Sequence, residues 1–211
     1  RTLAGSLRIV AGAEFIPWLV IGVTLFIMFR NQMNRGMEAI AANRGLFAYR
    51  QVQPVDTVLA RCGLEGALST IVLSLMIFLF SLLGHNVVPH HPMVVLHIWG
   101  IVWAFGMGVA LIFSVVVTSL PEAGKFIRML MFPLYFLSGI LIPVQYFPHD
   151  LQQYLLYNPM LHAVELIRTG FFETYRAVDG VSVLYLHQWV WGSVFLGLLL
   201  QLRFKQRLLA Q

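Results

Sequence analysis

Long apolar stretches alternate with short polar ones along most of this 211-residue chain. A helix needs about 20 mostly apolar residues to cross the hydrocarbon core of a bilayer. Five stretches meet this requirement, at roughly 11–29, 58–83, 93–119, 126–144 and 183–202. The pattern therefore predicts an all-α protein, built as a polytopic bundle of transmembrane helices.

The composition agrees with this pattern, because 59% of the residues are hydrophobic and only 11% are charged. Soluble domains carry about 25% charged residues, so a soluble globular protein is excluded. The net charge of +5 is compatible with nucleic-acid binding, but basic residues of polytopic proteins collect in cytoplasmic loops. No nucleic-acid partner is expected.

The sequence offers no convincing metal or cofactor site. The single cysteine, Cys62, excludes an internal disulfide and a metal site built from cysteines. The external histidines His85, His90 and His91 have no carboxylate or thiol close to them in the sequence. We therefore expect no bound cofactor, no metal ligand and no catalytic residue.

Lys and Arg alternate between the connections in a way that orients the spans. Connections rich in these residues are cytoplasmic as a rule. This places 30–57, 119–126 and the C-terminus on the cytoplasmic side, and 84–92 and 145–182 on the external side. The residues before the first span would then be external. We therefore expect six spans, with the first one missing from this sequence.

The external stretch 145–182 differs from a simple loop. The apolar run before it breaks at Pro143, and Pro148 and Asn158-Pro159 each begin an amphipathic stretch. Irregular backbone at membrane depth survives only where protein or a water-filled cavity covers it. We predict a re-entrant segment that enters the external edge of the bilayer, turns and returns, with Asn158 as the N-cap of the returning helix.

The connection after the first span has apolar residues at helical spacing. Met37, Ile40, Ala41, Arg44 and Phe47 predict a short amphipathic helix that lies across the membrane face. Two interpretations stay open. The helix either anchors the ends of the spans or docks a soluble partner by a helix-in-groove contact.

Two groups of residues, in this order along the chain, resemble a known family. They are Ala39, Ile40, Asn43, Leu46, Val52, Pro54 and Asp56, followed by Phe136, Leu137, Ser138, Gly139, Asn158, Pro159, His162, Glu165 and Arg168. This ordered set is similar to the membrane (permease) subunit of type-2 ABC exporters, most of all to the capsular polysaccharide export permeases. The resemblance covers essentially the whole chain, so 1–211 is expected to form a single transmembrane permease domain.

The resemblance implies a homodimer of six-helix subunits in the bacterial inner membrane, each docked on an ATP-binding ABC subunit through a coupling helix at 35–49. It also implies periplasmic and outer-membrane export partners. The chain would lack the N-terminal interface helix and the first span of the family. The residues expected to contact the ATPase are Arg35, Ile40, Asn43, Arg44, Leu46 and Phe47.

The chain contains no G-x-x-x-x-G-K-[ST] phosphate-binding motif. If ATP drives the protein, another polypeptide hydrolyses it, so we expect a transport subunit rather than an enzyme. The expected cargo is capsular or related cell-surface polysaccharide, either free or lipid-linked. Two alternatives stay open: a same-fold exporter of a lipid or drug, and a membrane-bound enzyme that modifies glycans or lipids.

Candidate residues for a substrate path lie in the external segment and just before it. The aromatic side chains there either line a path for sugars, with apolar faces and hydroxyl groups, or form a belt at the membrane interface. Three further residues share one helix face and form either an ion-pair ladder or the surface of an external vestibule. The candidates are Tyr135, Tyr146, Phe147, Tyr154, Tyr157, His162, Glu165 and Arg168.

Overall fold

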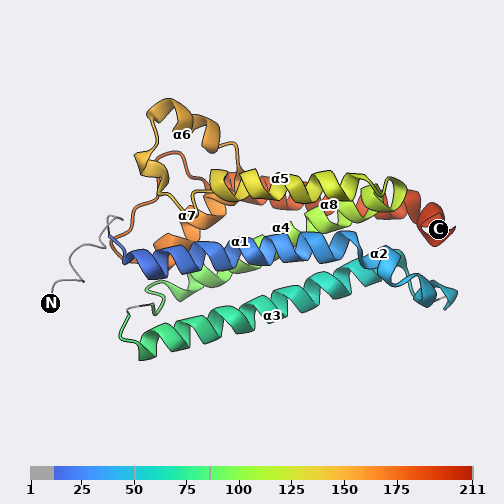
Figure 1. Ribbon diagram of the computed structural model, residues 1–211, viewed down its shortest axis with the longest axis horizontal. Coiled ribbons are helices and arrows are strands. Elements are labelled where there is room, and N and C mark those ends of the chain that lie inside the picture. The colour runs from blue at the N-terminus through green and yellow to red at the C-terminus, as the bar shows by residue number, and fades with distance from the viewer. Residues whose placement is uncertain (1–11, 50, 86, 211) are drawn as a thin grey trace. The chain divides into compact units, whose positions relative to one another are not determined.

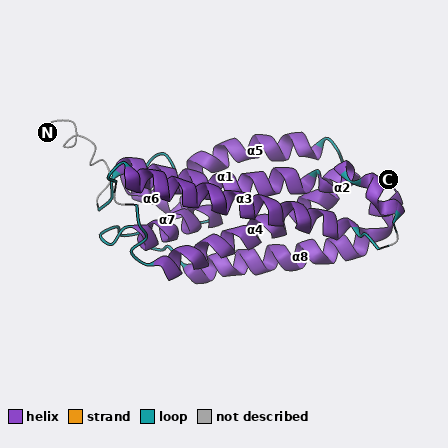
Figure 2. Ribbon diagram, turned by 90° about the horizontal axis from the view of Figure 1, so that it is seen from below, coloured by secondary structure: helices purple, strands orange, loops and turns teal. Residues whose placement is uncertain are grey.

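The structure, a computed structural model, describes residues 12–49, 51–85 and 87–210. Every regular element in these ranges is a helix (Figure 2). The longer helices are α1 (Phe15–Met37), α3 (Pro54–Leu82), α4 (Pro92–Ser119), α5 (Ala123–Leu137) and α8 (Val183–Ala210). The shorter ones are α2 (Ala39–Ala42), α6 (His149–Leu155), α7 (Pro159–Phe171) and the 3-10 helices η1 (Arg44–Ala48) and η2 (Val144–Tyr146). The predicted all-α class is confirmed.

Four helices, α1, α3, α4 and α8, are long and apolar enough to cross a membrane. They coincide with four of the five predicted spans. The remaining one, expected at 126–144, is represented by α5, which has 15 residues and ends at Leu137. Its end has a local cause, because Gly139 adopts a left-handed backbone with φ of +65°, which glycine does without steric cost. The proline at position 143 then prevents a further helical turn.

The chain divides into two compact units. Within the described residues, the first unit comprises 12–26, 70–100 and 134–186. The second comprises 27–69, 101–133 and 187–210. Each of the five long helices contributes residues to both units.

The connections that are rich in Lys and Arg and those that are poor in them belong to different units. The Lys- and Arg-poor connections 84–92 and 145–182 belong to the first unit, and the rich ones belong to the second. The described basic residues of the first unit are Arg168, which is buried, and Arg176, which is exposed. Those of the second unit are Arg30, Arg35, Arg44, Arg61, Lys125, Arg128, Arg203, Lys205 and Arg207.

The segment 35–49 is divided between the end of α1, the short helix α2 and η1. At Asn43 the backbone leaves the helical region, with φ of −117° and ψ of 21°. The side-chain amide of Asn43 donates a hydrogen bond of 2.7 Å to the carbonyl oxygen of Ala39. Asparagine competes for backbone partners in this way and so favours turns over helix interiors. The segment is therefore two short turns of helix, where the sequence predicts one continuous amphipathic helix.

The segment that the sequence predicts to be external forms three short helices in the first unit, η2, α6 and α7 (Figure 1). Helix α6 begins directly after Pro148, and α7 has Pro159 in its first turn. Both starts marked by proline are as predicted. Leu161 of α7 packs with Val144 and Val178 in a small hydrophobic cluster that joins the segment together.

Candidate functional site

Asn158 joins the start of α7 to the end of α5. Its side-chain Oδ1 accepts a hydrogen bond of 3.0 Å from the backbone N–H of Met160, which is the predicted N-cap. Its Nδ2 donates to the hydroxyl oxygen of Ser138 at 3.0 Å and to the carbonyl oxygen of Leu137 at 3.3 Å. One amide therefore satisfies a donor at the first turn of α7 and an acceptor at the last turn of α5.

Arg168 binds the same break from the other end of α7. Its Nη1 donates a hydrogen bond of 2.9 Å to the carbonyl oxygen of Gly139. Its Nη2 donates one of 3.3 Å to the carbonyl oxygen of Ile140. The carbonyl groups at the end of a helix have no partner within the helix, and a positive charge is favourable there. Arg168 therefore stabilises the irregular backbone that follows α5.

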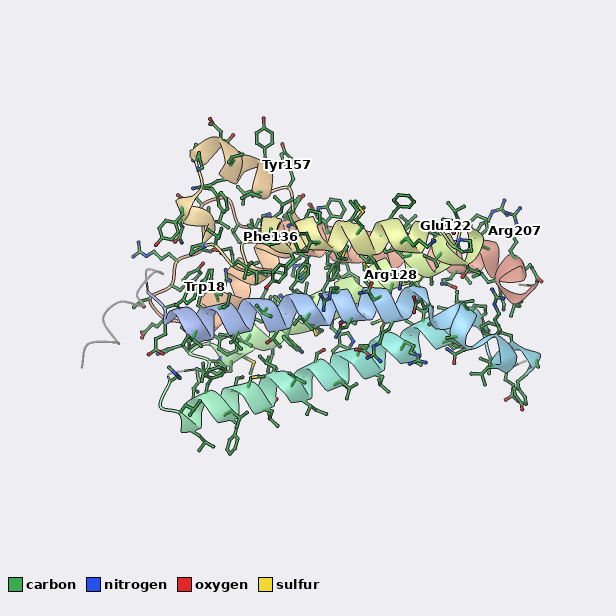
Figure 3. All side chains as sticks on the ribbon, in the orientation of Figure 1. Trp18, Glu122, Arg128, Phe136, Tyr157 and Arg207 are labelled. Atoms are coloured by element: carbon green, nitrogen blue, oxygen red, sulfur yellow. The ribbon has the colours of Figure 1, made fainter. Side chains whose placement is uncertain are left out.

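The guanidinium group of Arg168 also lies over the ring of Trp18 on α1, 3.5 Å from the ring centroid, as a cation–π contact. Figure 3 shows Trp18 near the start of α1. A Cβ atom at Gly22 would lie 2.7 Å from Nη2 of Arg168. The glycine thus makes room for the guanidinium group, and Trp18 covers its face.

Glu165 completes a buried ion pair. Both side chains are fully buried, and Oε1 of Glu165 lies 3.2 Å from Nη1 of Arg168. The hydroxyl group of Tyr175 lies 2.9 Å from both carboxylate oxygens, and the backbone N–H of Val178 lies 3.4 Å from Oε2. A buried ion pair repays its desolvation only where further hydrogen bonds satisfy it, and these donors supply them.

The electrostatics of this pair follow from burial. Helix α7 is not one of the helices that can span the membrane. Burial raises the pKa of Glu165, and Arg168, Tyr175 and Val178 oppose this shift. Burial lowers the pKa of Arg168, and Glu165 opposes that shift. Burial also raises the pKa of Tyr175, so that its hydroxyl group stays a donor.

His162 shares the face of α7 with this pair but has separate partners. Its Nε2 lies 2.7 Å from the carbonyl oxygen of Leu156, and its Nδ1 accepts a hydrogen bond of 3.0 Å from the backbone N–H of Ser182. A carbonyl oxygen requires a donor and an N–H requires an acceptor, so the ring is the neutral tautomer with its proton on Nε2. Burial lowers the pKa of His162.

These contacts bear on the three charged or titratable candidates for the substrate path. His162, Glu165 and Arg168 have exposed fractions of 1%, 0% and 0%. The ion-pair interpretation holds for Glu165 and Arg168. The alternative interpretation, a vestibule surface formed by all three side chains, does not fit, because they face the interior of the first unit.

The aromatic candidates fall into two groups. Tyr146, Tyr154 and Tyr157 are exposed by 62%, 72% and 73%. Tyr135 and Phe147 are partly buried. The ring of Tyr135 lies 5.2 Å from that of Phe26, which is a packing contact. The exposed tyrosines of the external segment are therefore the candidates that present a surface to a ligand.

The predicted ATPase-contact residues also differ in their exposure to solvent. Arg44 and Leu46 are exposed, and Arg35 has an exposed side chain that pairs with Glu65 at 2.9 Å. Ile40, in contrast, is only 1% exposed and belongs to the hydrophobic core of the second unit.

The other two residues of that set are half-buried. Asn43 is tied to its own turn, and Phe47 packs against the core that contains Ile40. Ile40 is therefore removed from the predicted contact surface. Sequence spacing placed it on the contact face of one helix, whereas in the structure it packs in a core cluster with Val58 and Leu111.

Sequence reasoning missed Trp18, the contact between Tyr175 and Glu165, and the pair formed by Glu38 and Arg128, whose side chains lie 2.8 Å apart. Arg168 and Trp18 are far apart in the sequence, and no local spacing connects them. The close pair Gly22 and Trp18 on one face of a predicted span is the one signal for a bulky partner. In the described ranges, no group of three or more metal-ligating side chains comes together.

The described residues form helices, and four of these helices are long and apolar enough to cross a membrane. The protein is therefore a polytopic membrane protein. The family model for the ABC-2 type transporter matches residues 3–172. This range contains the break after α5 and all of α7, together with their mutual contacts. The chain belongs to the ABC-2 type transporter family.

Individual relatives agree with this assignment. The chain is similar to the polysialic acid transport protein KpsM of Escherichia coli, with 35% identity over 193 residues, which are 92% of this chain and 74% of the relative. It is 31% identical to the capsule polysaccharide export inner-membrane protein CtrC of Neisseria meningitidis over 77% of this chain and 62% of the relative. It is 30% identical to the capsule polysaccharide export inner-membrane protein BexB of Haemophilus influenzae over 75% of this chain and 60% of the relative.

Proposed function

We propose that this chain is the membrane subunit of an exporter that moves a cell-surface polysaccharide out across the inner membrane. The observation that carries the proposal is the similarity, over 92% of the chain, to a protein named for polysialic acid transport. Two further relatives are named for capsule polysaccharide export in the inner membrane. The multi-pass helical structure agrees with this location.

ATP hydrolysis is assigned to a separate polypeptide. The sequence has no G-x-x-x-x-G-K-[ST] motif for the phosphates of ATP, whereas the family is that of ABC transporters. We therefore assign the chain to the transport subunit. The family resemblance also supports a second copy of this chain, and periplasmic and outer-membrane export proteins, as partners.

We place the ATPase contact on residues of the second unit. Most of the described Lys and Arg side chains belong to it, and positive residues mark the cytoplasmic side of polytopic proteins. Within this unit, Leu46 is exposed by 45% and Tyr49 by 66% in the connection between α1 and α3. Exposed apolar side chains beside exposed Arg44 fit a protein contact better than a solvated loop.

We place the connections 84–92 and 145–182, which are poor in Lys and Arg, on the external side, with 145–182 as a re-entrant segment. The contacts of Arg168 and Asn158 hold this segment against the end of α5. Because backbone polar groups at membrane depth need protein partners, these contacts support a segment that dips into the bilayer. Its exposed tyrosines then face the external compartment.

Deletion of the gene tests the proposed function. The deletion strain is expected to lose its surface polysaccharide and to accumulate polymer inside the cell, and a plasmid copy is expected to restore export. Unchanged surface polysaccharide in the deletion strain would contradict the proposal. New sensitivity to a small toxic compound, or an altered distribution of a lipid, would then favour the alternative cargo.

A further inference from the structure

A cavity of about 370 Å³ lies in the first unit. Small-molecule sites in proteins have volumes of about 300–1,000 Å³, so the cavity is large enough for a small group. Its walls come from α6, the start of α7, the turn before α8 and the first residues of α8. The lining residues are Gln153, Leu156, Tyr157, His162, Gly180, Ser182 and Tyr185.

Two tyrosines provide the aromatic part of this wall. The ring of Tyr157 is 73% exposed. The hydroxyl group of Tyr185 donates a hydrogen bond of 2.9 Å to the backbone carbonyl oxygen of Tyr157. The ring of Tyr185 lies 4.8 Å from that of His162. The two tyrosines are thus linked directly, and one of them is supported from behind by a buried ring.

The cavity is held open by fixed groups. Both ring nitrogens of His162 are engaged with the backbone, at Leu156 and Ser182. Gly180 has a φ of +94°, and a Cβ atom there would lie 2.8 Å from Cδ1 of Leu156. A larger residue at position 180 would therefore be strained and would also press on the wall. A site whose walls are already ordered loses little conformational entropy when a ligand binds.

The lining has no charged side chain, since its histidine, His162, is the neutral tautomer. Beside the tyrosine rings it offers the side-chain amide of Gln153 and the hydroxyl group of Ser182. Amides and hydroxyl groups both donate and accept hydrogen bonds, as sugar hydroxyl groups require. Tyrosine rings offer an apolar face to the C–H side of a sugar ring. The absence of a cation in this lining disfavours a carboxylate or phosphate ligand.

We propose that this cavity binds one neutral glycosyl unit of the exported polysaccharide, on the external side of the membrane. The inference rests on the proposed function for the nature of the cargo, and on the cavity for the place and the charge of the unit. The inference assigns sugar binding to Tyr157 and not to Tyr146 or Tyr154, because Tyr157 is the one of these three exposed tyrosines that lines the cavity.

The test uses the full chain in lipid nanodiscs and oligosaccharides released by mild acid from the surface polysaccharide of the same cells. Anion exchange separates the oligosaccharides into a neutral and an acidic fraction, and saturation-transfer NMR measures binding of each. The neutral fraction is expected to bind. Loss of a stacking ring in Tyr157→Ala, or of the amide in Gln153→Ala, is expected to raise its Kd about tenfold.

Leu151→Ala is the matched control. Leu151 is also on α6 and is exposed by 50%, but it does not line the cavity. Its variant is expected to bind the neutral fraction like the wild type. Equal affinities of the Leu151→Ala and Tyr157→Ala variants, tighter binding of the acidic fraction, or no binding of a neutral fraction to the wild type would each overturn the inference.

These outcomes are distinct from failure of the proposed function. A strain without the gene that still exports its polysaccharide contradicts the function itself. A strain that depends on the gene for export, with a protein that fails the oligosaccharide test, contradicts the cavity alone.

Discussion

Nη1 of Arg168 lies 2.9 Å from the carbonyl oxygen of Gly139, although the two residues are 29 positions apart in the sequence. Gly139 follows the last turn of α5, where backbone carbonyl groups lack donors within the helix. Arg168 lies near the end of α7. Arg168 therefore joins the end of α7 to the backbone that follows α5.

Removal of the Arg168 charge is expected to destabilise the first unit. In Arg168→Met, Glu165 is left as a buried carboxylate without its cation, which costs about 3–5 kcal/mol of the free energy of unfolding. Chemical unfolding in detergent micelles measures this value. The control is Arg176→Met, because Arg176 is exposed and lies in the same unit. Its effect is expected to stay within about 0.5 kcal/mol.

A double variant separates the ion pair from the carbonyl contacts. Adding Glu165→Gln to Arg168→Met removes the unpaired charge, so the double variant is expected to be more stable than Arg168→Met alone. The contacts to Gly139 and Ile140 stay lost, so wild-type stability is not expected to return. Equal stability of the single and double variants would show that the charge of Glu165 is not what makes the loss of Arg168 costly.

Asn158 has two roles that different substitutions separate. Asn158→Ala removes the N-cap of α7 and both contacts to α5, and is expected to cost about 1–3 kcal/mol of the free energy of unfolding. Asn158→Asp keeps the oxygen that accepts from Met160 but replaces the donor that faces Leu137. Thermal unfolding is expected to place Asn158→Asp below the wild type. An Asn158→Asp variant as stable as the wild type would mean that the N-cap alone matters.

His162 predicts a pH dependence of stability. Burial lowers its pKa in the native protein, whereas the unfolded value is about 6.5. The unfolded chain therefore binds a proton more readily in the window just below about pH 6.5. The contribution of His162 is complete above that pH and is lost as the pH falls through the lowered native value.

The unfolding midpoint of the wild type is expected to fall between about pH 7.5 and about pH 5, and to fall less in His162→Gln. Glutamine keeps a donor and an acceptor but does not titrate. His149→Gln, at an exposed position of α6, is expected to keep the full decrease. Identical pH profiles of the wild type and His162→Gln would exclude the assigned tautomer as the cause.

Substitutions in the connection between α1 and α3 are expected to affect ATPase binding and folding separately. Leu46→Asp places a charge at an exposed apolar position, and is expected to reduce copurification of the ATPase about tenfold without changing thermal unfolding. Leu120→Asp is the control, because Leu120 is exposed by 59% in the connection between α4 and α5. Ile40→Asp is expected to unfold the protein, since Ile40 is 1% exposed. Undiminished copurification with Leu46→Asp would contradict docking at this surface.

Much of the architecture could be predicted from the sequence, because the bilayer imposes a length and a hydropathy on each span. The spans that became α1, α3, α4 and α8 were visible as apolar stretches, and Asn158-Pro159 was visible as a helix start. The end of α5 was placed too late. The apolar run Ile140 to Pro143 continues the hydropathy signal, whereas the backbone turns at Gly139.

The contacts of the residues on α7 could not be predicted from the sequence. His162, Glu165 and Arg168 were found by their spacing on one helix, which shows that they share a face but not what that face meets. Their burial depends on partners that are distant in the sequence, such as Trp18 and Tyr175. The spacing of Ile40 misled for a related reason, since its burial depends on core residues that are distant in the sequence, such as Val58 and Leu111.

The most direct test of the account is ATP-driven transport of the polymer itself. Inverted inner-membrane vesicles expose the cytoplasmic side, so an outward pump carries its cargo into the vesicle lumen. Vesicles with this chain and its ATPase are expected to accumulate radiolabelled polysaccharide when ATP is added, and vesicles from the deletion strain are not. Equal accumulation of the polymer in both kinds of vesicle would contradict the assignment of this chain as the export subunit.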